Sequence, residues 1–158
     1  ELTDPPALRF WPTVKGRDGC RTPMVWEKDA PNAGFSEGTP WLPVKAPQAA
    51  KAVDQQQGPE SILSWYKDVI AFRKATPALC GTKTVFLNLP EPILAFHRSK
   101  EGQELTCVFN LSKDPVRLNA PGEADFLGPH HASLADGVLE LPGNGFAILN
   151  AKVALTAV

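Results

Sequence analysis

The uneven distribution of proline and glycine is the feature that most constrains the fold of this chain. The 158 residues include 16 prolines and 12 glycines, and many of them fall within the first 59 residues, together with Trp11, Trp26 and Trp41. Proline removes a backbone hydrogen-bond donor and glycine weakens regular elements, so this stretch excludes long helices and central strands. We expect a long, irregular, aromatic-rich segment that is functional or lies against another domain.

The next stretch has helical periodicity. Apolar residues recur at helical spacing within GPESILSWYKDVIAFRKATP, at Ile62, Tyr66, Val69 and Ile70. Pro59 suits a first helical turn and Pro77 ends a helix, so the pattern predicts a helix from Pro59 to Ala75. More than one of its faces is apolar, which indicates packing on both sides.

From Leu79 onward the pattern changes to short runs rich in β-branched and aromatic residues: TVFLNL, ILAFHRS, ELTCVFNL, PVRLN, GVLELP and GFAILN. Turn residues such as Glu101-Gly102 and Asp136-Gly137 separate the runs. Strands at this spacing with no helices between them predict an antiparallel β-sandwich. The phenylalanines of this half are expected in its core: Phe86, Phe96, Phe109 and Phe126.

Composition excludes several classes of function. A formal net charge of −1 gives no reason to expect nucleic acid or an anionic membrane as a partner. No apolar run approaches the roughly 20 residues that span a bilayer. The three cysteines (Cys20, Cys80 and Cys107) are odd in number and widely spaced, which argues against a disulfide framework and a zinc site. His130 and His131 are adjacent and diverge in a strand, and no phosphate-binding loop occurs, so we expect neither a metal nor a cofactor.

The candidate functional residues lie in GRDGCRTPMVW, residues 16–26. Arg17 and Arg21 each offer a planar fork of donors suited to carboxylates or to vicinal sugar hydroxyls, and Asp18 is a potential partner for either one. From spacing alone, a structural ion-pair cluster that holds down the loop is the favoured interpretation, and ligand binding is the alternative.

Longer motifs add to this interpretation. FWPTVKGRDGCRTPM, followed by NAGFSEGTPWLPV and QQQGPESILSWYKDVIAFRKATPAL, resembles the region that closes the catalytic barrel of glycoside hydrolase family 13, in its bacterial α-glucosidase and oligo-1,6-glucosidase branch. The resemblance covers roughly Asp4 to Leu79. It implies that residues 1–78 are the last loop and last helix of a (β/α)8 barrel, and that residues 79–158 are an all-β antiparallel C-terminal domain. The fold class of the whole chain would then be α+β.

The resemblance also implies a chemistry. Family enzymes of this kind are retaining glycosidases, and an arginine matching Arg17 or Arg21 binds hydroxyls of the nonreducing-end glucose; the choice between the two stays open. The family motifs that carry the catalytic carboxylates are absent from these 158 residues. We therefore expect no catalytic residue here, an α-glucoside or oligosaccharide substrate, and a missing N-terminal catalytic barrel as partner.

Two further questions stay open at the level of the sequence. The alternative function is a non-catalytic carbohydrate-binding or structural β-domain, and a cytoplasmic and a periplasmic location are both compatible with the sequence. We also expect the two parts of the chain to differ in how well they are ordered. The sandwich should fold alone, whereas residues 1–58 should be poorly ordered without the barrel.

Overall fold

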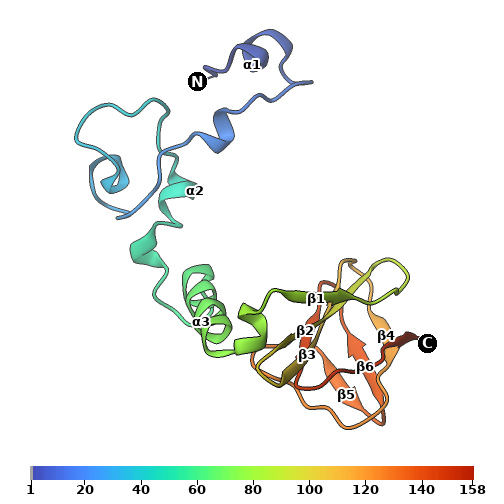
Figure 1. The fold of residues 1–158 in the computed structure, drawn as a ribbon. Coiled ribbons are helices and arrows are strands. Elements are labelled where there is room, and N and C mark those ends of the chain that lie inside the picture. Colours follow the sequence, from blue (N-terminus) through green and yellow to red (C-terminus); the bar gives the residue numbers. More distant parts are fainter. Residues whose placement is uncertain (1) are drawn as a thin grey trace. The chain divides into compact units, whose positions relative to one another are not determined.

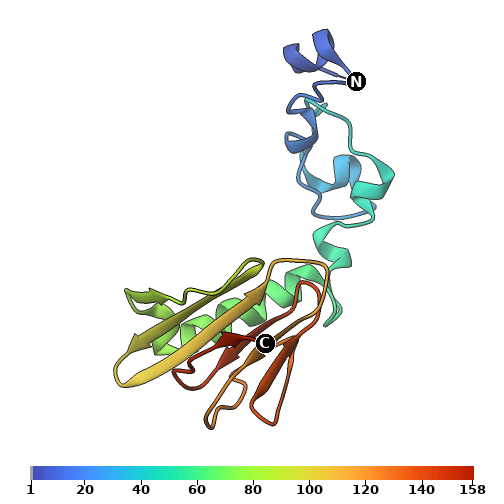
Figure 2. The same ribbon diagram turned by 90° about the vertical axis from the view of Figure 1, so that its right-hand side faces the viewer.

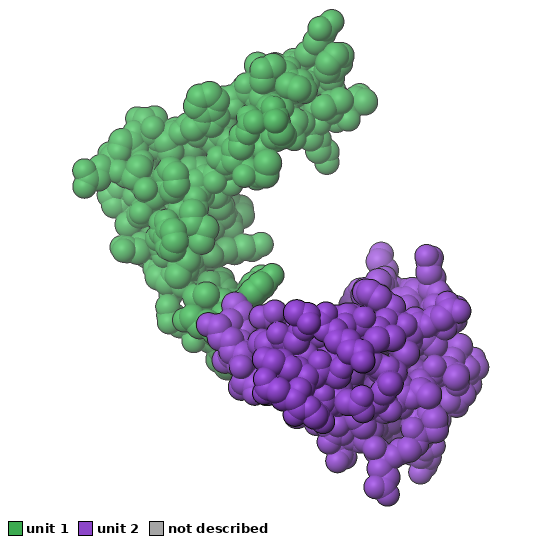
Figure 3. All heavy atoms as spheres, viewed as in Figure 1, with its two compact units in different colours: residues 1–67 green, residues 68–158 purple. Residues whose placement is uncertain are grey.

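The computed structural model describes residues 2–158. They form two compact units, one that ends at residue 67 and one of residues 68–158, coloured green and purple in Figure 3. Figure 1 follows the chain from the short helices of the first unit, through the long helix α3, to the β-sheets of the second. The chain is thus α+β with antiparallel sheets, as the sequence predicts.

The first unit consists of short helical turns joined by loops, as expected for a segment rich in proline and glycine. Its elements before α3 are α1 (Pro5–Phe10), η1 (Asp18–Cys20), η2 (Pro31–Gly34), α2 (Ala46–Ala49) and η3 (Val53–Gln55). The buried core of this region is small and consists of Val25, Ala33 and Ala52, with Val44 packed against it. Backbone hydrogen bonds from Val53 and Asp54 to the carbonyls of Val25 and Trp26 hold it together.

The tryptophans of the first unit do not enter this core. Trp11 is 55% exposed, Trp26 49% and Trp41 72%. The three indole rings of this segment therefore remain largely in water.

Helix α3 spans Ile62–Ala75, three residues shorter at its start than the sequence predicts. The Oγ of Ser61 accepts a hydrogen bond from the backbone N–H of Ser64 at 3.1 Å, so Ser61 caps the helix and Pro59 lies outside it. No residue of α3 is buried, and Ile62, Tyr66 and Ile70 form an exposed stripe at four-residue spacing. The expected packing on both sides is therefore not satisfied within the described residues.

The second unit contains a sandwich of two four-stranded antiparallel sheets, seen from two directions in Figures 1 and 2. One sheet has the order β1-β2-β3-β7 and the other β5-β6-β4-β8. Their inner faces share one buried core, to which the first sheet contributes Ala95, Val108, Ala147 and Leu149 and the second Leu118, Leu139 and Leu141. Alternation along each strand produces this core, as the sequence predicts.

Each of the six predicted runs forms a strand. The strands are β1 (Lys83–Phe86), β2 (Ile93–Lys100), β3 (Gln103–Asn110), β4 (Val116–Asn119), β6 (Val138–Leu141) and β7 (Phe146–Leu149). The sequence analysis does not predict two short strands, β5 (Ser133–Ala135) and β8 (Thr156–Ala157). The predicted turns Glu101-Gly102 and Asp136-Gly137 join β2 to β3 and β5 to β6, with positive φ at both residues of each turn.

The outer face of the first sheet is partly covered as well. Leu105 and Cys107 of β3 are buried although they alternate with the inner residues of that strand. The adjoining 3-10 turn η4 (Pro77–Cys80) packs against β2 and β3, and the guanidinium of Arg98 donates to the carbonyls of Ala78 and Leu79. Arg98 therefore ties the end of the helical segment to the sheet.

The phenylalanine row is a correction to the sequence analysis. Phe126 packs against the core, as expected, but Phe86, Phe96 and Phe109 continue with Phe146 in a row on the outer face of the first sheet. Adjacent ring centroids lie 5.7–6.2 Å apart. These residues alternate with the inner residues of the same strands, and apolar character alone does not tell the two faces apart.

Within the part of the chain that the structure describes, there is no helix with the length and apolar character needed to cross a membrane.

Candidate functional site

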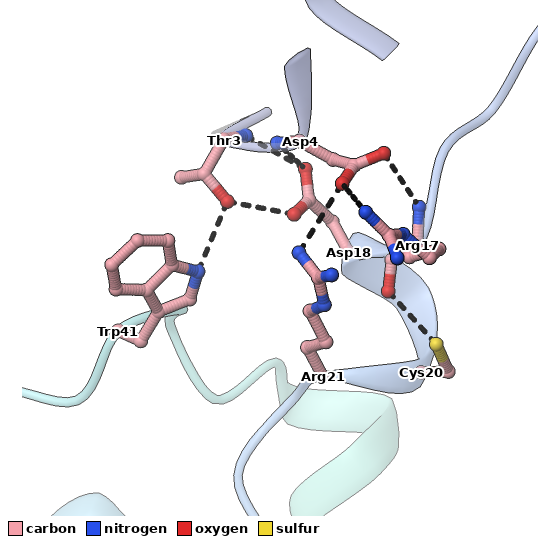
Figure 4. Close-up of polar contacts among 7 residues, drawn as sticks. All are labelled: Thr3, Asp4, Arg17, Asp18, Cys20, Arg21 and Trp41. Carbon is pink, nitrogen blue, oxygen red and sulfur yellow. Dashed lines mark hydrogen bonds and ion pairs between the residues drawn. The ribbon is translucent and has the colours of Figure 1, made fainter. Parts of the chain in front are cut away.

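The two candidate arginines lie beside a buried carboxylate that the sequence analysis did not single out. Asp4 occupies the N-cap position of α1 but makes no capping hydrogen bond with its side chain. It points instead toward the loop that carries Arg17 and Arg21, as Figure 4 shows. Asp4 is 1% exposed, whereas the side chains of Arg17 and Arg21 are 67% and 39% exposed.

Both oxygens of Asp4 accept hydrogen bonds from this loop. Oδ1 accepts from Nη2 of Arg17 at 3.4 Å and from Nη1 of Arg21 at 3.2 Å, and Oδ2 accepts from the backbone N–H of Arg17 at 3.2 Å. A buried carboxylate is costly unless it is paired and hydrogen-bonded, and Asp4 is both. The three residues form one charged cluster.

Gly16 makes this close approach possible. Its φ is +70°, in the left-handed region that favours glycine. A Cβ at this position would lie 2.6 Å from the Cβ of Ala7 and 2.7 Å from Oδ2 of Asp4. Only a residue without a side chain lets the backbone of Arg17 reach the carboxylate.

Asp18 has a different role from the one expected. The sequence analysis offered it as a partner for an arginine, but its carboxylate accepts from Thr3, through N–H and Oγ1 at 2.7 Å each, and from the backbone N–H of Asp4 at 3.0 Å. Oγ1 of Thr3 in turn accepts from the indole Nε1 of Trp41 at 3.0 Å (Figure 4). Asp18 therefore holds the backbone of the segment that carries Asp4.

The hydrogen bonds of Asp18 set its charge state. The Thr3 hydroxyl, then the backbone N–H groups of Asp4 and Thr3, lower the pKa of Asp18 below its ordinary value of 3.8, against the opposing effect of burial. A general acid in a glycosidase needs a raised pKa. Asp18 is consequently a structural anion, and the carboxylate of Asp4 forms ion pairs with two guanidinium groups.

The cluster leaves most guanidinium donors for other acceptors. A guanidinium carries five N–H donors in a fixed fork. Each of the two arginines uses one of its side-chain donors on Asp4. The arrangement presents a preoriented, cationic pair of forks, a geometry that suits hydroxyl or carboxylate oxygens.

The histidines His97 and His130 and the buried Cys107 have structural contacts. Nε2 of His97 lies 3.0 Å from the carbonyl oxygen of Val153, and the ring of His130 stacks on Phe126 with centroids 4.0 Å apart. Among residues 2–158 there is no group of three or more histidine, cysteine or acidic side chains that could hold a metal ion. Burial raises the pKa of Cys107 to about 11, so this thiol is not a nucleophile.

Comparison with known proteins places this loop in a family. Residues 1–81 match the model of the alpha amylase catalytic domain. The chain belongs to the alpha-amylase family, glycoside hydrolase family 13. The matched stretch contains both arginines, Asp4 and the whole of α3.

Curated relatives in the alpha-amylase family carry glucosidase names. The chain is 44% identical to a probable alpha-glucosidase of Rhizobium meliloti (strain 1021), over 77% of this chain and 22% of that protein. It is 39% identical to a probable oligo-1,6-glucosidase of Bacillus subtilis (strain 168), over 68% of this chain and 19% of that protein. The chain thus spans about a fifth of the length of these relatives.

Solved structures share the fold. A crystal structure of the alpha-glucosyl transfer enzyme XgtA is 40% identical, with a TM-score of 0.80, over 95% of this chain and 29% of that chain. The trehalulose synthase MutB from Pseudomonas mesoacidophila MX-45 is 27% identical, with a TM-score of 0.69, over 87% and 26%. Both the helical segment and the sandwich therefore occur together in larger proteins.

Proposed function

We propose that this chain is the C-terminal portion of a retaining α-glucosidase that releases α-linked glucose from the nonreducing ends of oligosaccharides or glucosides. In this proposal residues 1–78 complete a catalytic (β/α)8 barrel and residues 79–158 form the C-terminal domain. The chain supplies a sugar-binding arginine and structural support. The nucleophile and the acid come from polypeptide upstream.

The observation that carries the proposal is the pair of arginines held on the buried Asp4. Two guanidinium groups share one oxygen of Asp4, so the charge of this carboxylate is compensated by one of them and the other is in excess. Their unused donors are matched to vicinal hydroxyls. Arg17 is the stronger candidate for the sugar contact, because its side chain is the more exposed and its backbone is also anchored on Asp4.

Unpartnered apolar surface supports the need for an upstream barrel. Ile62 is 71% exposed and Tyr66 62%, on the same face of α3. The family match covers this helix and ends at residue 81, close to the proposed domain boundary. A barrel helix buries such a stripe against its neighbours, so in this proposal the upstream barrel covers the stripe.

The proposal is tested with a chromogenic α-glucoside, using this chain alone and the longer polypeptide that includes the upstream barrel. We expect no turnover by the chain alone and hydrolysis by the longer protein. In the longer protein, Arg17→Ala or Arg21→Ala should lower kcat/KM. The corresponding loss of transition-state stabilisation should be about 1–3 kcal/mol, as for lost charge-assisted hydrogen bonds. Turnover by the isolated chain, or unchanged kinetics in both variants, contradicts the proposal.

A second candidate function is carbohydrate binding by the β-domain without catalysis. The row of phenylalanines on the outer face of the first sheet favours it, because an aromatic face matches the apolar face of a pyranose. Phe86 is 67% exposed at the end of this row. The other rings stack on one another, which is equally what protein packing requires.

Titration of the 158-residue chain with maltose, followed by NMR, separates the two functions. The α-glucosidase proposal predicts no shift at Phe86 or Phe96, since sugar recognition lies in the arginine loop. Saturable shifts at these rings, abolished by Phe86→Ala, establish the binding function instead.

A further inference from the structure

The carboxylate of Asp4 is buried beside the arginine loop, and the proposed function gives it no role in sugar recognition. It lies at the start of α1, 13 to 17 residues before the groups that it binds. A surface ion pair contributes little to stability, but a carboxylate that is 1% exposed and receives three donors is held in one place. Its partners are held with it.

Contacts of both its backbone and its side chain hold Asp4 in place. Its backbone N–H donates to Asp18, which is itself fixed by Thr3, and Thr3 is bound by the indole of Trp41. On the other side, the absence of a side chain at Gly16 lets Arg17 approach. Asp4 therefore has little freedom to follow an arginine that moves.

We propose that Asp4 is a positioning residue, which holds Arg17 and Arg21 in a single orientation before the sugar binds. The inference rests on the proposed function, since it assumes that these arginines meet the substrate. Preorganised donors bind more tightly than mobile ones, because the side-chain entropy is lost on folding and not on binding. Asp4 itself touches no sugar in this account and acts through the two guanidinium groups.

The test uses the full-length protein with its barrel and a chromogenic α-glucoside. Asp4→Asn keeps the size of the side chain and an acceptor for Arg17 N–H but removes the charge that orients the guanidinium groups. We expect KM to rise about tenfold with a smaller change in kcat, because the arginines still reach the sugar but are no longer held. Asp4→Glu keeps the charge and should restore part of the loss.

Two further variants make the outcome specific. In an Arg17→Ala/Arg21→Ala background, Asp4→Asn should change KM by less than twofold, because a residue that acts through the arginines has nothing left to position. Glu140→Gln is the matched control: it removes a carboxylate from the exposed ion pair with Arg117, whose Nε and Oε1 are 2.9 Å apart, and should leave KM unchanged.

The outcomes separate this inference from the proposed function. If the arginine variants lower kcat/KM but Asp4→Asn and Asp4→Glu leave KM unchanged, the positioning role is wrong and the proposed function stands. An equal effect of Asp4→Asn with and without the arginines also overturns it, since Asp4 then acts by another route. If both single arginine variants leave the kinetics unchanged, the proposed function itself fails. Should Asp4→Asn fold poorly, Asp4→Ser, which also removes the charge, decides the question by the same KM comparison in both backgrounds.

Discussion

The two units of this chain differ in how much apolar surface they bury. Residues 68–158 enclose leucines and alanines between two sheets, whereas residues 1–67 bury only a few small side chains and leave their tryptophans in water. The first unit gains its order from polar contacts, above all the cluster around Asp4 and Asp18. The difference shows that a segment with only a small apolar core can still have defined local geometry.

The largest difference in the free energy of unfolding is expected between a substitution in the sandwich core and one on the exposed stripe of α3. Leu139→Ala removes a fully buried side chain from between the sheets and should reduce the free energy of unfolding by about 2–5 kcal/mol. Ile62→Ala, on the exposed stripe of α3, should change it by less than about 0.5 kcal/mol. Urea denaturation of this chain, followed by far-UV circular dichroism, measures both. Equal losses would mean that the α3 stripe is packed within the chain.

Thiol reactivity should be far lower at Cys107, in the second unit, than at Cys20 in the first. Burial raises the pKa of the Cys107 thiol to about 11, which lowers its thiolate fraction about a hundredfold relative to an unperturbed thiol. Cys20, in the first unit, is exposed. Iodoacetamide at pH 8 with mass-spectrometric readout should modify Cys20 rapidly and leave Cys107 unmodified. Comparable rates would show that the sandwich opens readily.

A smaller effect is expected where the C-terminal segment joins the sandwich. Oγ1 of the buried Thr106 donates to the carbonyl of Ala151 and accepts from the N–H of Val153, both at 2.8 Å. Thr106→Val leaves these two backbone groups unpaired and should cost about 1–3 kcal/mol in the free energy of unfolding. The exposed Thr82→Val is its control and should be neutral. A neutral Thr106→Val would show that water replaces the hydroxyl.

The smallest effect is a pH dependence of the first unit. Because the folded state lowers the pKa of Asp18, the stabilisation is fully present above 3.8 and is lost as the pH falls through the lower folded value. The NMR signals of the Thr3 and Asp4 amides, which donate to Asp18, should therefore titrate below pH 3.8. Asp18→Asn should abolish that titration. A midpoint at or above 3.8 would contradict the hydrogen bonding described here.

Most of the fold could be predicted because its elements repeat a pattern. Alternation predicted six strands, but β5 and β8 contain only three and two residues, too few to show a period. The start of α3 was misplaced because Pro59 and Ser61 are both plausible first-turn residues, and the structure places the cap on Ser61. Which face of a strand meets the core depends on the partner sheet, so the phenylalanine row was assigned to the wrong side.

The site could be predicted only in part. Two arginines in a glycine-rich loop are visible in the sequence, and they do form the cluster. Asp4 was missed because it lies 17 residues from Arg21 and precedes two prolines, a context typical of a helix N-cap. Asp18 was preferred as the partner because it is adjacent in sequence, but its carboxylate faces Thr3. Polar contacts between residues that are distant in the sequence produce no periodic pattern, so the sequence does not reveal them.

Native-state hydrogen exchange across the 158 residues tests the contrast between the units most directly. We predict that the amides of β2 and β3 exchange only by global unfolding, whereas most amides of residues 1–58 exchange orders of magnitude faster in the isolated chain. Adding the upstream barrel in the same polypeptide should slow exchange in residues 1–58 and leave β2 and β3 unchanged. Equal protection of both regions in the isolated chain would contradict the account.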